Sequence, residues 1–211
     1  SGKPIVTYNG SATYRKISKT LDLLSPYEFV KLQGEVKPEL LTGYYQEGND
    51  ADGTPYRYQS LDDYIGLSGV DWQGETFNPT WSQDHNFSLM GGSDNTKYNA
   101  SFSRYIENGI FKNSGFDKTT AKFRLDQKIN KKVSFNVTVN YAQTNRKGTG
   151  TSGDSGRFNM LAQILSARPT GGLKLTDEAL LESAIDPEML ETGESLAQVN
   201  PVKQTESVTN N

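Results

Sequence analysis

The 211-residue sequence contains no cysteine, a single histidine (His85) and no run of eighteen apolar residues. The absence of cysteine excludes disulfide bonds and thiolate metal sites. The absence of a long apolar run excludes a transmembrane helix. Hydrophobic residues make up only 34% of the chain. This low fraction still allows the wall of a membrane β-barrel, because only every second residue of a barrel strand faces lipid.

The formal net charge is −3, and its distribution does not indicate a nucleic-acid partner. Basic residues predominate between Trp81 and Lys147, whereas acidic residues predominate beyond Gly171. We interpret this asymmetry as two regions of the chain that lie in different environments, not as a charged binding tail.

Five segments alternate between apolar and polar residues with a period of two, which is typical of strands with one apolar face. They are Pro4–Tyr14, Asp84–Met90, Lys97–Glu107, Thr119–Asn130 and Val133–Tyr141. The longest cover about ten to twelve residues, and a tilted barrel strand needs roughly nine to eleven to cross a bilayer. We therefore predict an all-β fold: an antiparallel transmembrane β-barrel segment of about five long strands.

The connections between these strands alternate in length, as they do in outer-membrane barrels with long loops outside and short turns inside. The pattern predicts a first barrel strand in residues 1–18, a long extracellular loop with a short helix in 19–80, four antiparallel barrel strands in 81–145, and a second long extracellular loop with short helices in 146–211. Lys131 and Lys132, in a short turn, are then periplasmic.

Helix-start signals lie in both long loops. Ser25 and Glu28 form a capping box around Pro26, which suits the first helical position, so a short helix is predicted to about Gly34. Apolar residues from Phe158 to Leu165 have helical spacing. Further helix starts are predicted at Thr176-Asp177-Glu178 and at Asp186-Pro187-Glu188.

Seven short motifs, taken in order, resemble the family of SusC/RagA-type TonB-linked outer-membrane transporters. They are Ser1–Gly10, Leu24–Phe29, Asp71–Gln73, His85–Gly92, Lys97–Ser101, Asn108–Phe111 and Arg124–Asp126. The resemblance covers about residues 1–168, and it identifies the segment as the junction between plug and barrel followed by the first barrel strands. From Gly171 onward the chain has only the general character of a variable external loop.

The resemblance implies a large plugged barrel in the bacterial outer membrane, in contact with its lipid. It implies import of oligosaccharides or peptides, driven by the TonB complex through an N-terminal region that this sequence lacks. A SusD-like surface lipoprotein is implied as a lid.

Candidate substrate-binding residues are six aromatic residues in or beside the first long loop, because aromatic faces bind sugar rings and loops carry function. They are Tyr44, Tyr45, Tyr56, Tyr58, Trp72 and Trp81. The alternative is that they pack the core of the loop itself or form the aromatic girdle at the membrane interface.

No catalytic or metal site is predicted. His85 has no second histidine or carboxylate at ligand spacing, and the Asp50–Gly53 turn fails the calcium-loop pattern because Gln59 occupies the twelfth position. No nucleophile–base pair or phosphate loop is present, so we expect neither an enzyme nor a cofactor. Two other functions remain open: a passive structural barrel or adhesin, and a soluble carbohydrate-binding β-domain that uses the tyrosine-rich loop. Strand length and the alternation of loop lengths favour the transporter.

Overall fold

The computed structural model describes residues 2–148, 159–184 and 200–207. The chain forms two compact units. The sheet unit comprises Ser1–Ile17 and Asn78–Gly148, and the loop unit comprises Ser18–Phe77 and Thr149–Asn211. Among the described residues, no helix has both the length and the hydropathy needed to cross a membrane.

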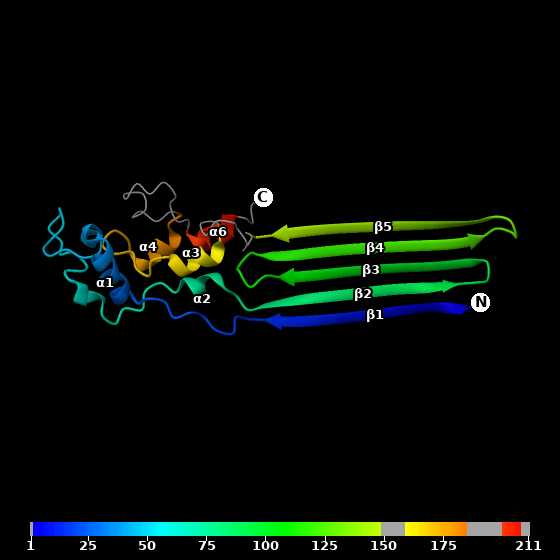
Figure 1. The fold of residues 1–211 in the computed structure, drawn as a ribbon, viewed down its shortest axis with the longest axis horizontal. Coiled ribbons are helices and arrows are strands. Elements are labelled where there is room, and N and C mark those ends of the chain that lie inside the picture. Colours follow the sequence, from blue (N-terminus) through cyan, green and yellow to red (C-terminus); the bar gives the residue numbers. More distant parts are fainter. Residues whose placement is uncertain (1, 149–158, 185–199, 208–211) are drawn as a thin grey trace. The chain divides into compact units, whose positions relative to one another are not determined.

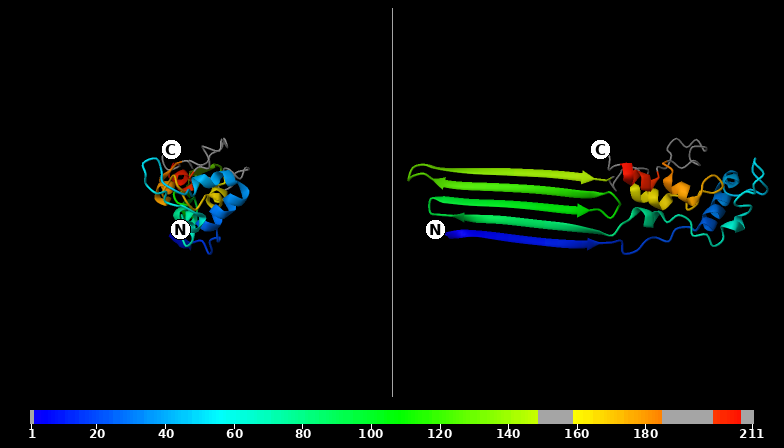
Figure 2. Two further views of the ribbon diagram at one scale, coloured as in Figure 1. Left: turned by 90° about the vertical axis from the view of Figure 1, so that its left-hand side faces the viewer. Right: turned by 180° about the vertical axis from the view of Figure 1, so that it is seen from behind.

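The sheet unit is a single sheet of five strands in the order β1-β2-β3-β4-β5, and each pair of neighbours is antiparallel (Figure 1). The strands are β1 (Gly2–Arg15), β2 (Thr80–Gly92), β3 (Thr96–Asn108), β4 (Gly115–Lys128) and β5 (Ser134–Lys147). Figure 2 shows the same order of strands from behind. The prediction of about five long antiparallel strands is confirmed.

Three strands are longer than the alternation of apolar residues indicates. β2 begins at Thr80 instead of Asp84, β4 begins at Gly115 instead of Thr119, and β5 continues past Tyr141 to Lys147. The added residues pair in the same register as the rest, for example Asp117 with Asn145. Backbone hydrogen bonding therefore continues beyond the point where the side chains stop alternating in hydropathy.

Short turns join the strands at one end of the sheet. In the β2–β3 turn, Gly92 has a φ of +151°, and a Cβ there would lie 2.1 Å from the carbonyl oxygen of Thr96, so only glycine fits. In the β4–β5 turn, the Asn130 side chain accepts hydrogen bonds from the backbone N–H groups of Lys132 (2.8 Å) and Val133 (2.9 Å). Such local bonds stabilise a tight reversal of the chain.

The loop unit is built from short helices. They are α1 (Pro26–Val36), η1 (Pro38–Gly43), η2 (Leu61–Tyr64), α2 (Trp72–Thr76), α3 (Met160–Ser166), α4 (Asp177–Glu182) and α6 (Pro201–Ser207). The predicted capping box is present: the Ser25 hydroxyl accepts from the Glu28 N–H (3.3 Å), and the Glu28 carboxylate accepts from the Ser25 N–H (2.9 Å). The helix starts predicted near Phe158 and at Thr176 correspond to α3 and α4. The start predicted at Asp186 lies outside the described residues.

The core of the loop unit is small and aromatic. Val30, Tyr44 and Tyr64 are fully buried, and the Tyr64 hydroxyl donates to the carbonyl oxygen of Tyr44 (2.6 Å). A second set of bonds joins the two stretches of chain that form the unit. The indole N–H of Trp72 donates to the carbonyl of Arg168 (2.9 Å), and the Val70 N–H donates to the carbonyl of Pro169 (2.8 Å). Residues about a hundred positions apart in the sequence therefore form one packed unit.

Candidate functional site

The two faces of the sheet differ in chemistry, because one register runs through all five strands. Residues paired across the sheet form rows. One row is Tyr8, Phe87, Phe102, Ala121 and Tyr141, and the next is Val6, Leu89, Ala100, Phe123 and Val139. We call the side that carries these rows the apolar face. Many of its side chains are exposed, including Tyr8 (60%), Val139 (56%) and Tyr141 (53%).

The opposite side, the polar face, carries the residues between these positions. Two of its rows are Asn9, Asn86, Ser103, Thr120 and Ala142, and Thr7, Ser88, Ser101, Lys122 and Asn140. Successive residues of a strand point to opposite faces. The alternation of residue types along each strand therefore places apolar side chains on one face of the sheet and polar side chains on the other. This arrangement is typical of a sheet with lipid on one side and water or protein on the other.

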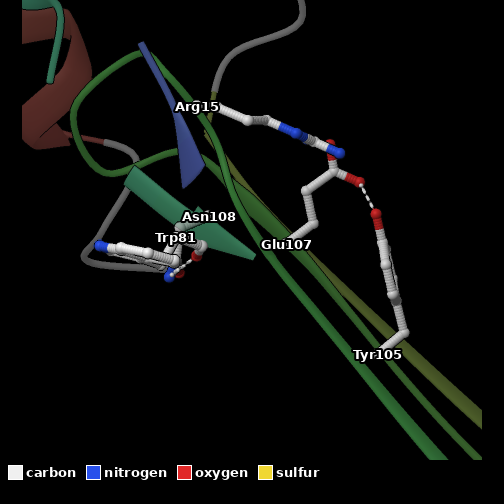
Figure 3. Close-up of polar contacts among 5 residues, drawn as sticks. All are labelled: Arg15, Trp81, Tyr105, Glu107 and Asn108. Carbon is white, nitrogen blue, oxygen red and sulfur yellow. Dashed lines mark hydrogen bonds and ion pairs between the residues drawn. The ribbon is translucent and has the colours of Figure 1, made fainter. Parts of the chain in front are cut away.

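A cluster of charged and aromatic residues lies on the polar face at the end of the sheet where the long loops attach. The Arg15 guanidinium forms an ion pair with Glu107, and the Tyr105 hydroxyl donates to the other carboxylate oxygen of Glu107 (2.7 Å) (Figure 3). The Tyr105 and Phe116 ring centroids are 6.2 Å apart, and the Arg146 guanidinium lies 5.7 Å from the Phe116 ring centroid. We call these five residues the end cluster.

The end cluster links strands that are distant in sequence. Arg15 is on β1 and Glu107 on β3, so their ion pair crosses the intervening strand β2. Through Phe116 and Arg146 the contacts continue to β4 and β5. Sequence analysis did not find this cluster, since its members become neighbours only through the register of the sheet.

The predicted aromatic residues lie in several places. Tyr44 is 1% exposed in the loop core, and Tyr45 and Tyr58 are partly buried against that core. Tyr56 is half-buried in the turn that pairs Asn49 with Pro55. The structure therefore brings Tyr44, Tyr45 and Tyr58 together, and their role in binding a sugar stays a prediction.

The two tryptophans lie in different units. Trp72 is 3% exposed in the loop unit. Trp81 is 55% exposed in the sheet unit. Its ring packs against Tyr14 with centroids 5.1 Å apart, and its carbonyl accepts from the Asn108 side chain (2.8 Å) (Figure 3). Of the two, only Trp81 presents an accessible aromatic face.

Tyr64 is a central residue that sequence analysis missed. Its ring lies 4.2 Å from that of Tyr58 between centroids, at an interplanar angle of 32°. Burial raises the pKa of Tyr64 above its ordinary value, so its hydroxyl stays protonated and donates to Tyr44. The sequence feature that could have indicated this helical turn is the capping box formed by Ser60 and Asp63 at the start of η2.

The loop unit also contains a groove of about 660 Å³. Its lining includes Leu21, Leu23, Leu24, Leu32, Trp72 and Pro169. Leu21 is 59% exposed, and Leu23 and Leu24 are each more than 40% exposed. Exposed apolar clusters of this kind mark contact surfaces for other molecules.

The acidic turn and the histidine use their polar atoms within the chain. Asp50 accepts from the N–H groups of Asp52 and Thr54, each at 3.1 Å. The ring nitrogens of His85 contact the Tyr8 hydroxyl (2.8 Å) and the Gln83 side chain (3.2 Å). Among the described residues, no group of three or more His, Asp or Glu side chains is arranged to hold a metal ion.

Two stretches of similarity link the chain to TonB-dependent receptors. No model of a protein family matches the chain. Over 122 residues, the chain is 31% identical to the TonB-dependent receptor SusC of Bacteroides thetaiotaomicron, covering 58% of this chain and 10% of that protein. Over 157 residues, it is 24% identical to the TonB-dependent receptor P3 of Formosa agariphila, covering 74% of this chain and 13% of that protein.

Among solved structures, the RagAB peptide transporter matches with a TM-score of 0.47 and 23% identity, covering 70% of this chain and 18% of that chain. The chain spans only about a tenth of the length of the curated relatives it matches. The two sequence matches support the assignment of the chain as a fragment of a SusC/RagA-type TonB-dependent transporter.

Proposed function

We propose that this chain forms the first wall strands and two surface loops of a bacterial outer-membrane transporter that imports oligosaccharides or peptides. The observation that carries the proposal is the continuous apolar face, which extends without interruption over five long antiparallel strands. A wall of this kind faces lipid with its apolar side and the lumen with its polar side.

The exposure of the apolar face argues for a lipid environment. Phe123, Val137 and Val139 are each more than 40% exposed and lie on the same face. Water around such a large apolar surface is unfavourable by about 25 cal/mol per Å², and contiguous patches of this size are rare on soluble monomers. A soluble carbohydrate-binding domain, the second candidate, would have to leave this face in water.

The polar face suits contact with a plug and with a hydrated solute. Its serine, threonine and asparagine side chains offer hydrogen-bond donors and acceptors along every strand. Lys118 and Lys122 on β4 have no ion-pair partner within the described residues. A lumen lined in this way binds water and polar solutes.

The loop unit supports roles at the cell surface. We propose that residues 19–80 and 146–211 are extracellular, that the leucine-lined groove contacts the SusD-like lipoprotein, and that the more accessible aromatic residues contact substrate. TonB-dependent coupling rests on the sequence relatives, both of which are TonB-dependent receptors. A passive barrel would not need that coupling.

An uptake experiment tests the proposal. The complete receptor is expressed together with its lipoprotein partner, and uptake of fluorescent oligosaccharides or peptides is measured with and without a functional TonB. We expect uptake that requires TonB and a receptor that fractionates with the outer membrane. Uptake that is unchanged without TonB would favour the passive barrel, and recovery in the soluble fraction would favour the soluble sugar-binding domain.

A further inference from the structure

The apolar face is not apolar over its whole length. Towards the end of the sheet where the long loops attach, the row next to Tyr8, Phe87, Phe102, Ala121 and Tyr141 becomes polar. That row, which we call the boundary row, consists of Gly10, His85, Arg104, Thr119 and Gln143. The row beyond it is mixed and consists of Ala12, Gln83, Ile106, Asp117 and Asn145. The chemistry of the surface therefore changes between two adjacent rows on β2, β3, β4 and β5.

The height of the apolar part matches a bilayer. On β5 and the residue before it, apolar side chains recur from Tyr141 down to Val133, in four steps of two residues. Each step is about 6.8 Å along a strand, or about 5 Å along the membrane normal for a strand tilted by roughly 40°. The apolar part then extends about 20 Å, close to the band of about 25 Å found on outer-membrane barrels.

The aromatic side chains mark the edge of this band. Tyr8, Phe87, Phe102 and Tyr141 occupy a single row, directly beside the boundary row. Rings of aromatic residues lie at the interface between hydrocarbon and headgroups. The boundary row therefore lies at the level of the lipid headgroups, and the exposed Tyr14–Trp81 pair lies beyond it on β1 and β2.

Arg104 is the principal charge of the boundary row. Its side chain is exposed, and it has no hydrogen-bond or ion-pair partner among the residues that the structure describes. Its cross-strand neighbours are His85 on β2 and Thr119 on β4. The nearest acid in the next row, Asp117, pairs with Ile106 and does not form an ion pair with Arg104.

The guanidinium group of Arg104 is available to an anion from outside the chain. In the hydrocarbon it would be strongly destabilising, whereas near the membrane surface anionic headgroups attract it. Its guanidinium group matches a phosphate in geometry and charge. The Gln143 side chain accepts from the Tyr141 hydroxyl through its Oε1 (2.8 Å), and its amide N–H groups add donors on the same row.

We propose that Arg104, with its neighbours in the boundary row, binds the phosphate group of a membrane lipid at the outer edge of the barrel wall. The inference rests on the proposed function, since it requires that the apolar face contacts a bilayer. The inference adds a lipid-binding site, and it fixes how deep the residues of each strand lie in the membrane. Neither depends on the identity of the imported substrate.

Lipid binding is tested on the complete receptor in detergent by native mass spectrometry. Phosphatidate and diacylglycerol form a matched pair of probes, because they differ only by the phosphate group. We expect the receptor to retain phosphatidate over diacylglycerol, and Arg104→Gln to weaken phosphatidate binding about fivefold, the effect of one basic residue near a membrane surface. Lys122→Gln, which removes a cation from the polar face, is the matched control and leaves binding unchanged.

Two results would overturn the site. One is equal phosphatidate binding by the wild type and Arg104→Gln. The other is displacement of phosphatidate by an equal concentration of inorganic phosphate, which would show that the ligand is a free anion and not a lipid.

A depth measurement separates this inference from the proposed function. Spin labels are attached to single cysteines that replace Val139, Gln143 or Asn145 of β5 in an otherwise cysteine-free receptor, and oxygen and nickel accessibilities are compared. We expect Val139 in hydrocarbon, Gln143 at the headgroups and Asn145 in water. If Val139 is in water, the barrel-wall proposal fails and the lipid site fails with it. If Val139 and Gln143 are both in hydrocarbon, the barrel wall stands and the boundary row is wrong.

Discussion

Arg15, the last residue of β1, forms an ion pair with Glu107 near the end of β3, across the intervening strand β2. The Glu107 carboxylate also accepts the Tyr105 hydroxyl (2.7 Å), so both of its oxygens have donors. The two side chains of the ion pair are each about one-third exposed. The pair links β1 to β3 near the end of the sheet where the long loops begin.

Glu107→Gln tests the contribution of this ion pair. The substitution keeps the shape of the side chain and removes its charge, so we expect the complete receptor to lose about 0.2–1 kcal/mol, the range measured for exposed pairs. The shift of the folded band to the unfolded band on heated gels measures the loss. Tyr105→Phe removes a single hydrogen bond and leaves the ion pair, so it should cost less. A larger loss in Tyr105→Phe than in Glu107→Gln would show that the ion pair contributes little.

The assignment of the faces predicts a contrast between adjacent residues of β5. Val137 lies on the apolar face and Asn136 on the polar face. Val137→Arg should destabilise the complete barrel by about 2–4 kcal/mol if the residue lies near the bilayer midplane. Asn136→Arg should be far milder, because that side chain faces the lumen. Equilibrium unfolding in urea with lipid vesicles measures both, and equal losses would mean that the faces are assigned wrongly.

The orientation of the strands predicts different accessibility for two exposed residues. We expect a cysteine at Ser60 in the loop unit to react with a membrane-impermeant maleimide on whole cells. A cysteine at Lys131 in the β4–β5 turn should react only after the outer membrane is permeabilised. The reverse pattern would place the short turns outside the cell.

The capping box of α1 predicts a dependence on pH. Hydrogen bonds from the Ser25 backbone N–H and hydroxyl lower the pKa of Glu28 below its ordinary value. Because the folded pKa is lower than the unfolded value of about 4.3, the box stabilises α1 above that pH, and the stabilisation is lost as the pH falls through the folded pKa.

Hydrogen exchange of the first turn of α1, corrected for the intrinsic rate at each pH, measures this effect. Protection should decrease in acid in the wild type and should lose its pH dependence in Glu28→Gln. Glu35→Gln, at an exposed position of the same helix, is the control and should behave like the wild type. A pH dependence that survives in Glu28→Gln would assign it to another group.

The open sheet predicts the behaviour of residues 1–211 expressed alone. Among the described residues, β1 and β5 each pair on one side only, so two edges and the whole apolar face would meet water. We expect aggregation, or solubility only in detergent, in size-exclusion chromatography. A monodisperse monomer without detergent and with cooperative melting would support the soluble sugar-binding domain instead.

The strands were predictable from sequence because their side chains alternate in hydropathy. The alternation is clear from Val133 to Tyr141, where one face is almost entirely apolar. It fades at Asp117 and Asn145, although the backbone pairing continues there. The hydropathy of a side chain depends on whether lipid or water surrounds that part of the strand. It does not depend on where the backbone hydrogen bonds end, so the ends of the strands were predicted wrongly.

The candidate site was less predictable. The aromatic content of the first long loop was visible, but the burial of Tyr44 and Trp72 depends on contacts that form only in the folded loop unit. The ion pair of Arg15 and Glu107 joins residues 92 positions apart, and no local pattern indicates such a pair. Local capping signals performed better: Ser25 and Thr176 both begin helices, whereas the Asp71 cap of α2 was overlooked.

The pairing from β2 to β5 proceeds one residue at a time, and the only register shift among the described residues lies between Gly2 and Ile5 of β1. Inserting a single residue in the middle of β3 would therefore move every later side chain of that strand to the opposite face and place Arg104 or its neighbours in the wrong medium. Related receptors should accordingly tolerate insertions of any length in the exposed connections between the helices of the loop unit. Within the strands, they should tolerate changes only in pairs of residues.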